Sequence, residues 1–203
     1  ANDVTEQIIK MLCFDAKESA NSNSDRKNYG NNRYIYSNLR QWLNSAAAAG
    51  AWYTPQHSAD AAPTSANVWN SVNAYDGLAG FLNAFTANEQ AALLDTTITV
   101  GKSSTDGGGT ETCTDKIFPL SCTEVGLSGD HTCGSLLAIF SDNASRIATV
   151  TAECVANSNY NSNPAANAAW YYWLRDAYAR SADFARCVSS DGTLNWDYAY
   201  YGN

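Results

Sequence analysis

The chain has 203 residues, of which 45% are hydrophobic and 12% aromatic, enough to build the core of a globular domain. Its formal net charge of −8, from 20 acidic and 12 basic residues, repels a phosphate backbone, so nucleic acid is not an expected partner. No run approaches the roughly eighteen apolar residues of a membrane span, and ANDVTEQIIK at the start lacks the features of a signal peptide. The Asn-, Ser-, Ala- and Tyr-rich composition is common on extracellular or virion surfaces.

Helical and extended patterns alternate in the first fifty residues. Apolar residues recur at helical spacing after Asp3 or Asn2, either of which can cap a helix, and predict a short amphipathic helix that ends near FDAKE at residues 14–18. After a polar loop, RYIY at residues 33–36 predicts a short strand. Ser37 then begins SNLRQWLNS, for which we expect a helix with Ser37 as its N-cap and Trp42 in the core.

A long irregular loop and a second helix are expected next. Residues 46–75 are rich in Ala, Pro, Ser and Asn, which favours a loop pinned by scattered Trp and Tyr side chains. Thr86 and Glu89 have the spacing of a capping box and predict a helix over residues 87–94. The alternation of apolar and polar residues at 96–100 predicts a strand.

The middle of the chain combines flexible and apolar segments. The Gly-rich residues 102–115 lack the glycine spacing and the lysine of a phosphate-binding loop, and predict a flexible turn or hairpin tip. Residues 116–120 predict a buried strand, residues 121–125 the start of a helix and residues 155–169 a further loop. No repeat or composition change marks a boundary, so we expect residues 1–203 to form a single domain of mixed α and β structure.

The six cysteines do not form a metal-binding pattern. They have no C-x-x-C spacing and lie at no zinc-ligand interval from His57 or His131. Four of them fall in a Gly-, Thr- and Ser-rich region, where disulfides and small buried thiols are both compatible with the sequence. A catalytic cysteine needs a neighbouring base, and two histidines supply few candidates. The cysteines are Cys13, Cys113, Cys122, Cys133, Cys154 and Cys187.

The C-terminal segment, residues 170–203, holds ten of the 24 aromatic residues of the chain and no lysine. Trp173, Leu174 and Val188 are spaced as buried residues, and SDG at 190–192 predicts a tight turn between two strands. The later tyrosines carry too many hydroxyl groups to be buried together, since each buried phenol needs a hydrogen-bond partner. We therefore expect several of these rings to face solvent.

Two interpretations fit an exposed aromatic segment. Exposed Tyr and Trp interleaved with Ser, Asn, Asp and Arg are typical of a recognition surface, where rigid rings give contact area and small polar residues adapt their hydrogen bonds. Alternatively, a neighbouring subunit covers the rings. We favour the recognition surface and keep the subunit interface as the alternative.

An ordered set of motifs makes the chain similar to an uncharacterised domain family of phages and gut bacteria. That family carries a W-x-WLR motif and an SDG-[ST]-L turn, each followed by variable Asn, Ser, Tyr and Asp positions; residues 170–175 and 190–194 resemble them here. Upstream, the resemblance includes FDAKE at 14–18, YGNNRYIYSNLRQWLNS at 29–45 and WYTPQHSADAAP at 52–63. It covers most of the chain.

Domains of this kind resemble the C-type-lectin-like variable proteins of diversity-generating retroelements, in which adenine-directed mutagenesis rewrites asparagine codons at a surface site. The resemblance implies an α+β, C-type-lectin-like fold with two main helices, a small twisted antiparallel sheet and long loops. It makes residues 170–203 the variable ligand-binding segment. Relatives extend beyond both ends of this sequence, so we expect the chain to be a fragment of a longer one.

The resemblance also places the ligand-binding residues, which lie between the WLR and SDG motifs and after the second. The resemblance implies that a set of positions in these two stretches is variable. Apart from Ala177 and Ser181, we take all of these variable positions as binding candidates. These candidates are Asp176, Tyr178, Arg180, Asp183, Phe184, Cys187, Ser189, Trp196, Asp197, Tyr198, Tyr200 and Tyr201.

We therefore expect a non-enzymatic domain that binds a host cell-surface protein or glycan, as part of a phage tail-fibre, capsid-decorating or other surface protein. The alternative is a structural virion subunit, and a homo-oligomer is expected in either case. An enzyme is not expected, because fold alone carries no function and a lone histidine such as His57 in a polar loop is usually solvated or capping. Asn195 and Asp197 resemble calcium ligands, but such a tripeptide arises by chance in an Asn-rich chain, so no metal or cofactor is predicted.

Overall fold

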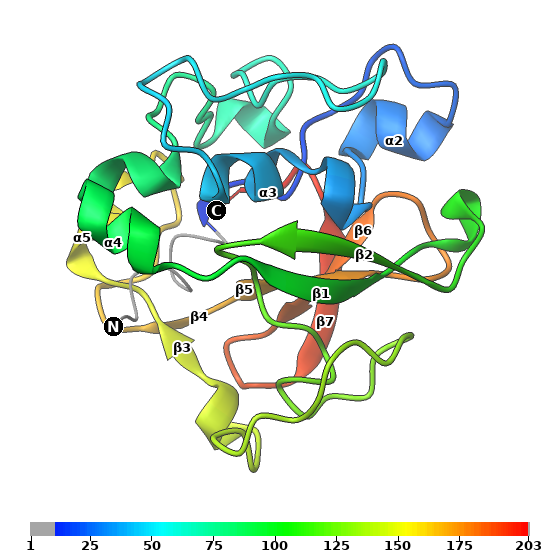
Figure 1. The fold of residues 1–203 in the computed structure, drawn as a ribbon, viewed down its shortest axis with the longest axis vertical. Helices are drawn as coiled ribbons and strands as arrows, with labels where there is room; N and C mark the ends of the chain where they lie inside the picture. Colours follow the sequence, from blue (N-terminus) through cyan, green and yellow to red (C-terminus); the bar gives the residue numbers. More distant parts are fainter. Residues whose placement is uncertain (1–10, 203) are drawn as a thin grey trace.

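The computed structural model describes residues 11–202 and has an α+β architecture of short helices and small antiparallel sheets (Figure 1). The helix predicted to begin at Asp3 lies mostly outside these residues. Long irregular segments connect the elements. None of the helices in the described part of the chain has the length and apolar character that a bilayer crossing requires.

The strands between residues 11 and 202 pair in three separate antiparallel sheets. β1 (Thr96–Gly101) pairs with β2 (Thr110–Asp115), β3 (Ala148–Thr149) pairs with β4 (Ala169–Trp170), and β5 (Tyr172–Ala177), β6 (Phe184–Val188) and β7 (Leu194–Tyr198) form a meander. The predicted strand at 96–100 is confirmed as β1. The predicted SDG turn is confirmed as the connection between β6 and β7.

The helices are short, and two of them begin at the predicted caps. They are α2 (Ser24–Tyr29), α3 (Asn38–Leu43), α4 (Ala87–Ala92) and α5 (Ala152–Asn157), with 3-10 turns η1 (Tyr34–Tyr36), η2 (Trp69–Ser71), η3 (Phe81–Ala84), η4 (Ser104–Asp106) and η5 (Ala144–Arg146). Ser37 Oγ accepts the Arg40 N–H at 3.1 Å at the start of α3. Thr86 and Glu89 form the reciprocal bonds of a capping box at the start of α4. Both predicted helices are thereby confirmed.

One face of the meander packs into the main hydrophobic core. Trp173 of β5 and Ala185 of β6 are buried there with Phe14, and α3 contributes Leu39 and Trp42. The rings of Phe14 and Trp173 meet edge to face with 5.9 Å between centroids. In Figure 1, α3 lies above the β1–β2 hairpin, and the meander passes behind that hairpin. The predicted core position of Trp42 is confirmed.

An ion pair between the buried Arg175 and the half-buried Glu124 joins three segments of the fold. Arg175 of β5 binds the two carboxylate oxygens of Glu124, each at 2.6 Å. It also donates to the carbonyl oxygens of Thr99 in β1 at 3.1 Å and of Pro119 at 2.9 Å. The planar guanidinium suits this bidentate contact. Because Arg175 is buried, loss of Glu124 would leave its charge uncompensated. The arginine of the WLR motif therefore ties β5 to β1 and to the segment that ends at Glu124.

Three local predictions are wrong. Residues 33–36 contain η1 rather than a strand, because the Ser37 N–H and Oγ both donate to the carbonyl three residues earlier. Residues 116–120 form no strand, because Asn44 Oδ1 accepts the N–H groups of the first two of them, which a neighbouring strand would otherwise pair. Residues 110–115, expected to belong to the Gly-rich turn, form β2.

Two further predictions are correct only in part. Residues 121–125 form a single turn, in which the Val125 N–H donates to the Ser121 carbonyl at 3.2 Å. Gly126 follows with a φ of +72°, which ends the helical conformation. The predicted loop at 155–169 begins inside α5.

Replacing Glu124 with alanine is expected to lower the free energy of unfolding by about 3–5 kcal/mol, because Arg175 would stay buried without its counter-charge. Urea denaturation followed by tryptophan fluorescence measures the change. Glu153→Ala, on the exposed first turn of α5, is the matched control and should change stability by less than about 0.5 kcal/mol. Equal losses in the two variants would contradict this role for the ion pair.

Candidate functional site

The pairing register of β6 and β7 assigns alternate side chains to two faces of the meander. Phe184 lies opposite Tyr198 and Arg186 lies opposite Trp196, so these four side chains share one face. Ala185 lies between Phe184 and Arg186 in β6, so its side chain is on the opposite face of the meander, where it is buried in the main core. The predicted binding residues therefore divide between an outer face and the core.

Aromatic rings form a connected series along the outer face. Trp196 stacks on Tyr178 with 5.3 Å between ring centroids and 15° between planes. Phe184 stacks on Tyr198 at 4.4 Å, and Tyr198 stacks on Tyr29 at 4.3 Å. Further rings extend the series. We call it the aromatic band; it consists of Tyr29, Trp69, Tyr178, Phe184, Trp196, Tyr198, Tyr200 and Tyr201.

Arg186 supports one end of the aromatic band. Its guanidinium carbon lies 4.5 Å from the ring centroid of Tyr178 and 5.5 Å from that of Trp196. Oδ2 of Asp130 accepts two N–H groups of this guanidinium, one of them at 3.0 Å, and so fixes its position. Cation–π contacts of this kind contribute roughly 0.5–2 kcal/mol. They hold Trp196 and Tyr178 as a preformed pair.

Exposure determines which candidates can meet a ligand. Trp196 is 46% exposed and Arg180 is also exposed, whereas Tyr200 is buried. The half-buried candidates are Tyr178, Phe184, Asp197, Tyr198 and Tyr201. The accessible part of the aromatic band is therefore a row of ring faces and edges, with Trp196 as its open end.

Five of the twelve predicted binding residues are buried, so the structure does not support a role in binding for all of them. Asp176 is buried, and its Oδ2 accepts the Cys122 N–H at 2.7 Å. Asp183 accepts the hydroxyl of Ser181, and Cys187 belongs to the main core. Side chains in these positions secure the sheet and have no access to a ligand. The buried candidates besides Tyr200 are Asp176, Asp183, Cys187 and Ser189.

Two members of the aromatic band, Tyr29 and Trp69, come from segments far from the C-terminus and were not predicted. Gly30 lets the chain beside Tyr29 pack closely against Asp15 and Tyr200. A Cβ at position 30 would lie 2.5 Å from the Asp15 carbonyl oxygen and 3.1 Å from the Tyr200 backbone nitrogen. The Tyr200 N–H donates to the Tyr29 carbonyl at 2.9 Å. In the sequence, the glycine after Tyr29 indicates that the backbone there packs closely against another segment. It does not indicate which segment that is.

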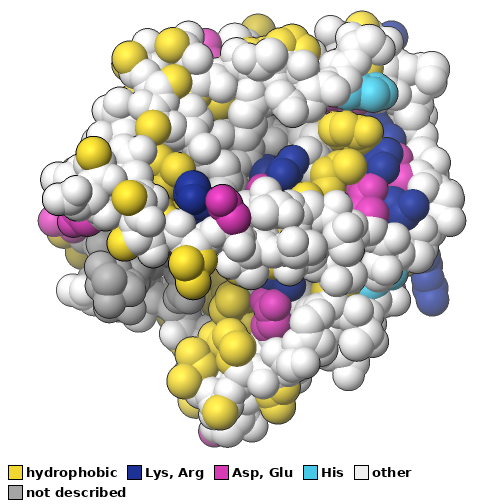
Figure 2. All heavy atoms as spheres, in the orientation of Figure 1, with side chains coloured by type: hydrophobic (Ala, Val, Ile, Leu, Met, Phe, Trp, Pro, Cys, Tyr) yellow, Lys and Arg dark blue, Asp and Glu magenta, His cyan; other side chains and the backbone are white. Residues whose placement is uncertain are grey.

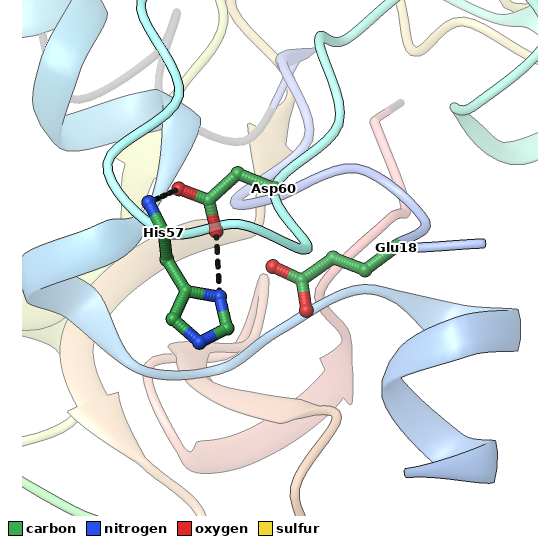
Figure 3. A group of neighbouring side chains, drawn as sticks. All are labelled: Glu18, His57 and Asp60. Carbon is green, nitrogen blue, oxygen red and sulfur yellow. Dashed lines mark hydrogen bonds and ion pairs between the residues drawn. The ribbon is translucent and has the colours of Figure 1, made fainter. Parts of the chain in front are cut away.

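A second group of side chains, Glu18, His57 and Asp60, forms a polar cluster between two segments (Figure 3). One nitrogen or oxygen of each lies within 4.8 Å of the others, so these described residues could hold a metal ion together. Asp60 Oδ2 accepts the N–H groups of Gln56 at 2.7 Å and of His57 at 2.6 Å. Sequence reasoning treated His57 as solvated or capping. It missed the cluster because Glu18 is distant along the chain.

The cysteine side chains are buried, apart from Cys113, which is half-buried. Burial raises the pKa of Cys13 and of Cys122 well above the ordinary thiol value, and raises the pKa of Cys113 and of Cys133 to about 12. Of the two alternatives that the sequence left for the four cysteines of the Gly-, Thr- and Ser-rich region, the structure has thiols rather than disulfides. The free cysteines include Cys13, Cys113, Cys122, Cys133 and Cys154.

Comparison with known proteins places this architecture in one domain family. Residues 4–203 match the model of the family described as Domain of unknown function (DUF6273). No curated protein and no solved structure matches the chain. The aromatic band, the ion pair and the polar cluster thus all lie within the residues that the family model covers.

Trp196→Ala is expected to lower the free energy of unfolding by about 1 kcal/mol, because the ring is partly exposed and loses mainly its stacking and cation–π contacts. Trp173→Ala, the matched change in the core, should cost about 3–5 kcal/mol. Chemical denaturation of both variants measures the difference. A loss in Trp196→Ala as large as in Trp173→Ala would show that Trp196 is a core residue.

Asp176→Asn is expected to change how stability depends on pH. Burial raises the pKa of Asp176 above its ordinary value of 3.8. The stabilising contribution of the protonated carboxyl is complete below pH 3.8 and is lost as the pH rises through the raised pKa. Asparagine does not ionise, so the variant does not lose stability in this way. Its free energy of unfolding relative to the unsubstituted chain should therefore increase as the pH rises above 3.8.

Urea denaturation at a series of pH values measures this dependence. Asp191→Asn provides a control of opposite sign, because hydrogen bonds from Thr193 lower the pKa of the exposed Asp191 carboxyl. Its ionised form is stabilising, so this variant should lose stability relative to the unsubstituted chain as the pH rises. Parallel pH curves for all three proteins would refute the assignment of a raised pKa to Asp176.

Proposed function

The chain belongs to the DUF6273 family, and we propose that this member is a non-enzymatic domain that binds a host cell-surface protein or glycan through the aromatic band. The proposal places the domain in a phage tail-fibre, capsid-decorating or other virion-surface protein, or in an extracellular one. It takes the fold as C-type-lectin-like, with residues 170–203 as a variable ligand-binding segment. The α+β architecture is compatible with this fold.

The observation that carries the proposal is the preformed pair of Trp196 and Tyr178. Trp196 is 46% exposed, yet its ring is held parallel to Tyr178 and beside the guanidinium of Arg186. A large exposed ring with a fixed orientation loses little conformational entropy on binding, which is why such rings act as anchors at recognition surfaces. The C–H faces of sugar rings and small apolar side chains both pack on surfaces of this type.

Polar groups along the aromatic band supply direction for such binding. Arg180 is exposed and follows Tyr178 by two residues, so its guanidinium is available for a bidentate contact with a carboxylate or phosphate of the ligand. The hydroxyl groups of Tyr198 and Tyr201 lie on half-buried rings and offer both a donor and an acceptor. The formal net charge of −8 disfavours nucleic acid as the ligand.

A glycan array probed with the full chain tests the proposal, with bacterial surface glycans and mucin glycans as the probes. We expect binding to a defined set of glycans, weakened by about tenfold or more in Trp196→Ala and in Tyr198→Ala, which corresponds to about 1.4 kcal/mol or more. Leu94→Ala, an exposed apolar change outside the aromatic band, should bind like the unsubstituted chain. Unchanged binding by both aromatic variants would exclude the band as the binding surface.

A structural subunit is the second candidate function, and an exposed apolar segment favours it. Leu136, Leu137, Ile139 and Ile147 are all exposed on the segment that leads from β2 past η5. Figure 2 shows hydrophobic side chains gathered at the bottom of the view. In Figure 1, which has the same orientation, the yellow-green part of the chain lies there. Apolar surface of this kind is a common feature of subunit interfaces. In this second candidate function, the exposed apolar segment forms the contact between subunits. The aromatic band is then either free to bind a ligand or covered by a neighbouring subunit.

Oligomeric state distinguishes the two surfaces. Sedimentation velocity of the full chain should show an oligomer that Ile139→Lys weakens and Trp196→Ala leaves intact, because a lysine charge cannot be buried in an apolar interface without a partner. If Trp196→Ala dissociates the oligomer, the aromatic band is an assembly interface and the binding proposal fails. A monomer at all concentrations would contradict the structural candidate.

A further inference from the structure

The cluster of Glu18, His57 and Asp60 has the composition of a metal-binding site. Glu18 comes from the segment before α2, and His57 and Asp60 come from the loop after α3. In Figure 3 the three side chains point toward one another from these two segments. One ligand atom of each lies within 4.8 Å of the other two. Metal–ligand bonds of roughly 2 Å mean that one ion can reach all three after small side-chain rotations.

Buried carboxylate oxygens at this place lack hydrogen-bond partners. The Asp60 side chain is 3% exposed, and its Oδ1 accepts no hydrogen bond. This oxygen faces His57 Nδ1 at 3.5 Å, and that nitrogen accepts the Ala59 N–H at 3.4 Å. Two acceptor atoms that face each other need a proton or a metal ion between them. Oδ2 of Asp15, a residue that is 1% exposed, also has no hydrogen-bond partner.

Negative charge gathers at this place. None of the Lys or Arg ion pairs within residues 11–202 involves Asp15, Glu18 or Asp60. Asp15 and Glu18 are both buried, and the Asp60 side chain is 3% exposed. A bound cation would relieve the repulsion among these three carboxyl groups.

We propose that Glu18, His57 and Asp60 bind a divalent transition-metal ion, and that zinc suits this set of ligands best. One imidazole nitrogen and two carboxylate oxygens fill three of the four positions that zinc usually has. Calcium is a poorer fit, because it prefers six to eight oxygen ligands. The His57 side chain is 43% exposed, so solvent has access to the remaining position.

Neighbouring residues would orient the ligands and connect the site to the aromatic band. The side-chain amides of Asn21 and Asn31 both donate to Glu18, an arrangement typical of the residues around a metal ligand. The segment that carries Glu18 also holds the end of β7, because the Asp15 N–H donates to the Ala199 carbonyl at 3.0 Å. A metal ion would join the loop of His57 to this segment. The metal proposal does not rest on the proposed function.

Isothermal titration calorimetry on the EDTA-treated, dialysed full chain tests the site, with ZnCl2, MnCl2 and CaCl2 as probes. We expect one equivalent of zinc to bind, more tightly than manganese or calcium. Glu18→Gln, Asp60→Asn and His57→Gln should each weaken zinc binding by more than about tenfold, since even an outer partner of a metal ligand contributes roughly 10- to 100-fold. His131→Gln and Glu153→Gln, which alter the same residue types elsewhere, should bind zinc like the unsubstituted chain.

Thermal unfolding of the same proteins separates loss of the metal site from loss of the fold. Zinc should raise the Tm of the unsubstituted chain and of both controls, but not that of the three ligand variants. Glu18→Gln keeps the side-chain size and removes a buried charge, so we expect it to fold without zinc. Absence of stoichiometric binding by all three ions, or undiminished zinc binding by the three ligand variants, would overturn the proposal. Calorimetry and glycan binding are independent readouts, so either proposal can fail alone.

Discussion

The ion pair between Arg175 and Glu124 is the interaction on which the rest of this structure depends. Between residues 11 and 202 the helices are short and the sheets are separate, so no continuous hydrogen-bonded ladder joins the elements of this part of the chain. A buried guanidinium has five donors and must satisfy them in place. Arg175 makes four hydrogen bonds, two to Glu124 and one each to the carbonyl oxygens of Thr99 and Pro119, and thereby joins β5 to β1 and to an irregular segment. Once β5 is held, the register of the meander places the aromatic band.

The segment of residues 14–18 links the core, the aromatic band and the polar cluster. Phe14 packs edge to face against Trp173 in the core. The next residues approach the end of the meander, where the Lys17 ammonium lies 5.3 Å from the ring centroid of Tyr200. Glu18 then turns toward His57 and Asp60. A binding surface built on irregular segments needs such support, because loops alone position side chains less precisely than strands do.

Sequence patterns predicted the features that depend on neighbours along the chain. The caps at Ser37 and Thr86 were predictable because the bonds concerned span only three residues. Residues 116–120 were not, because their backbone groups are paired by Asn44, which no local pattern indicates. The same distinction applies to the candidate site. The aromatic enrichment at 170–203 was visible in the sequence, but the burial of Asp176 and its neighbours was not.

The sequence by itself determined the cap positions, the hairpin turn at SDG, the core placement of Trp42 and the excess of aromatic residues near the C-terminus. Tertiary structure alone decided which face of the meander those rings occupy, that Tyr29 completes their stacking, and that Glu18 meets His57 and Asp60. The physical reason is the range of the interactions. Turns and caps are closed by hydrogen bonds between near neighbours, whereas ring stacks and charge clusters form between segments that come together when the core packs.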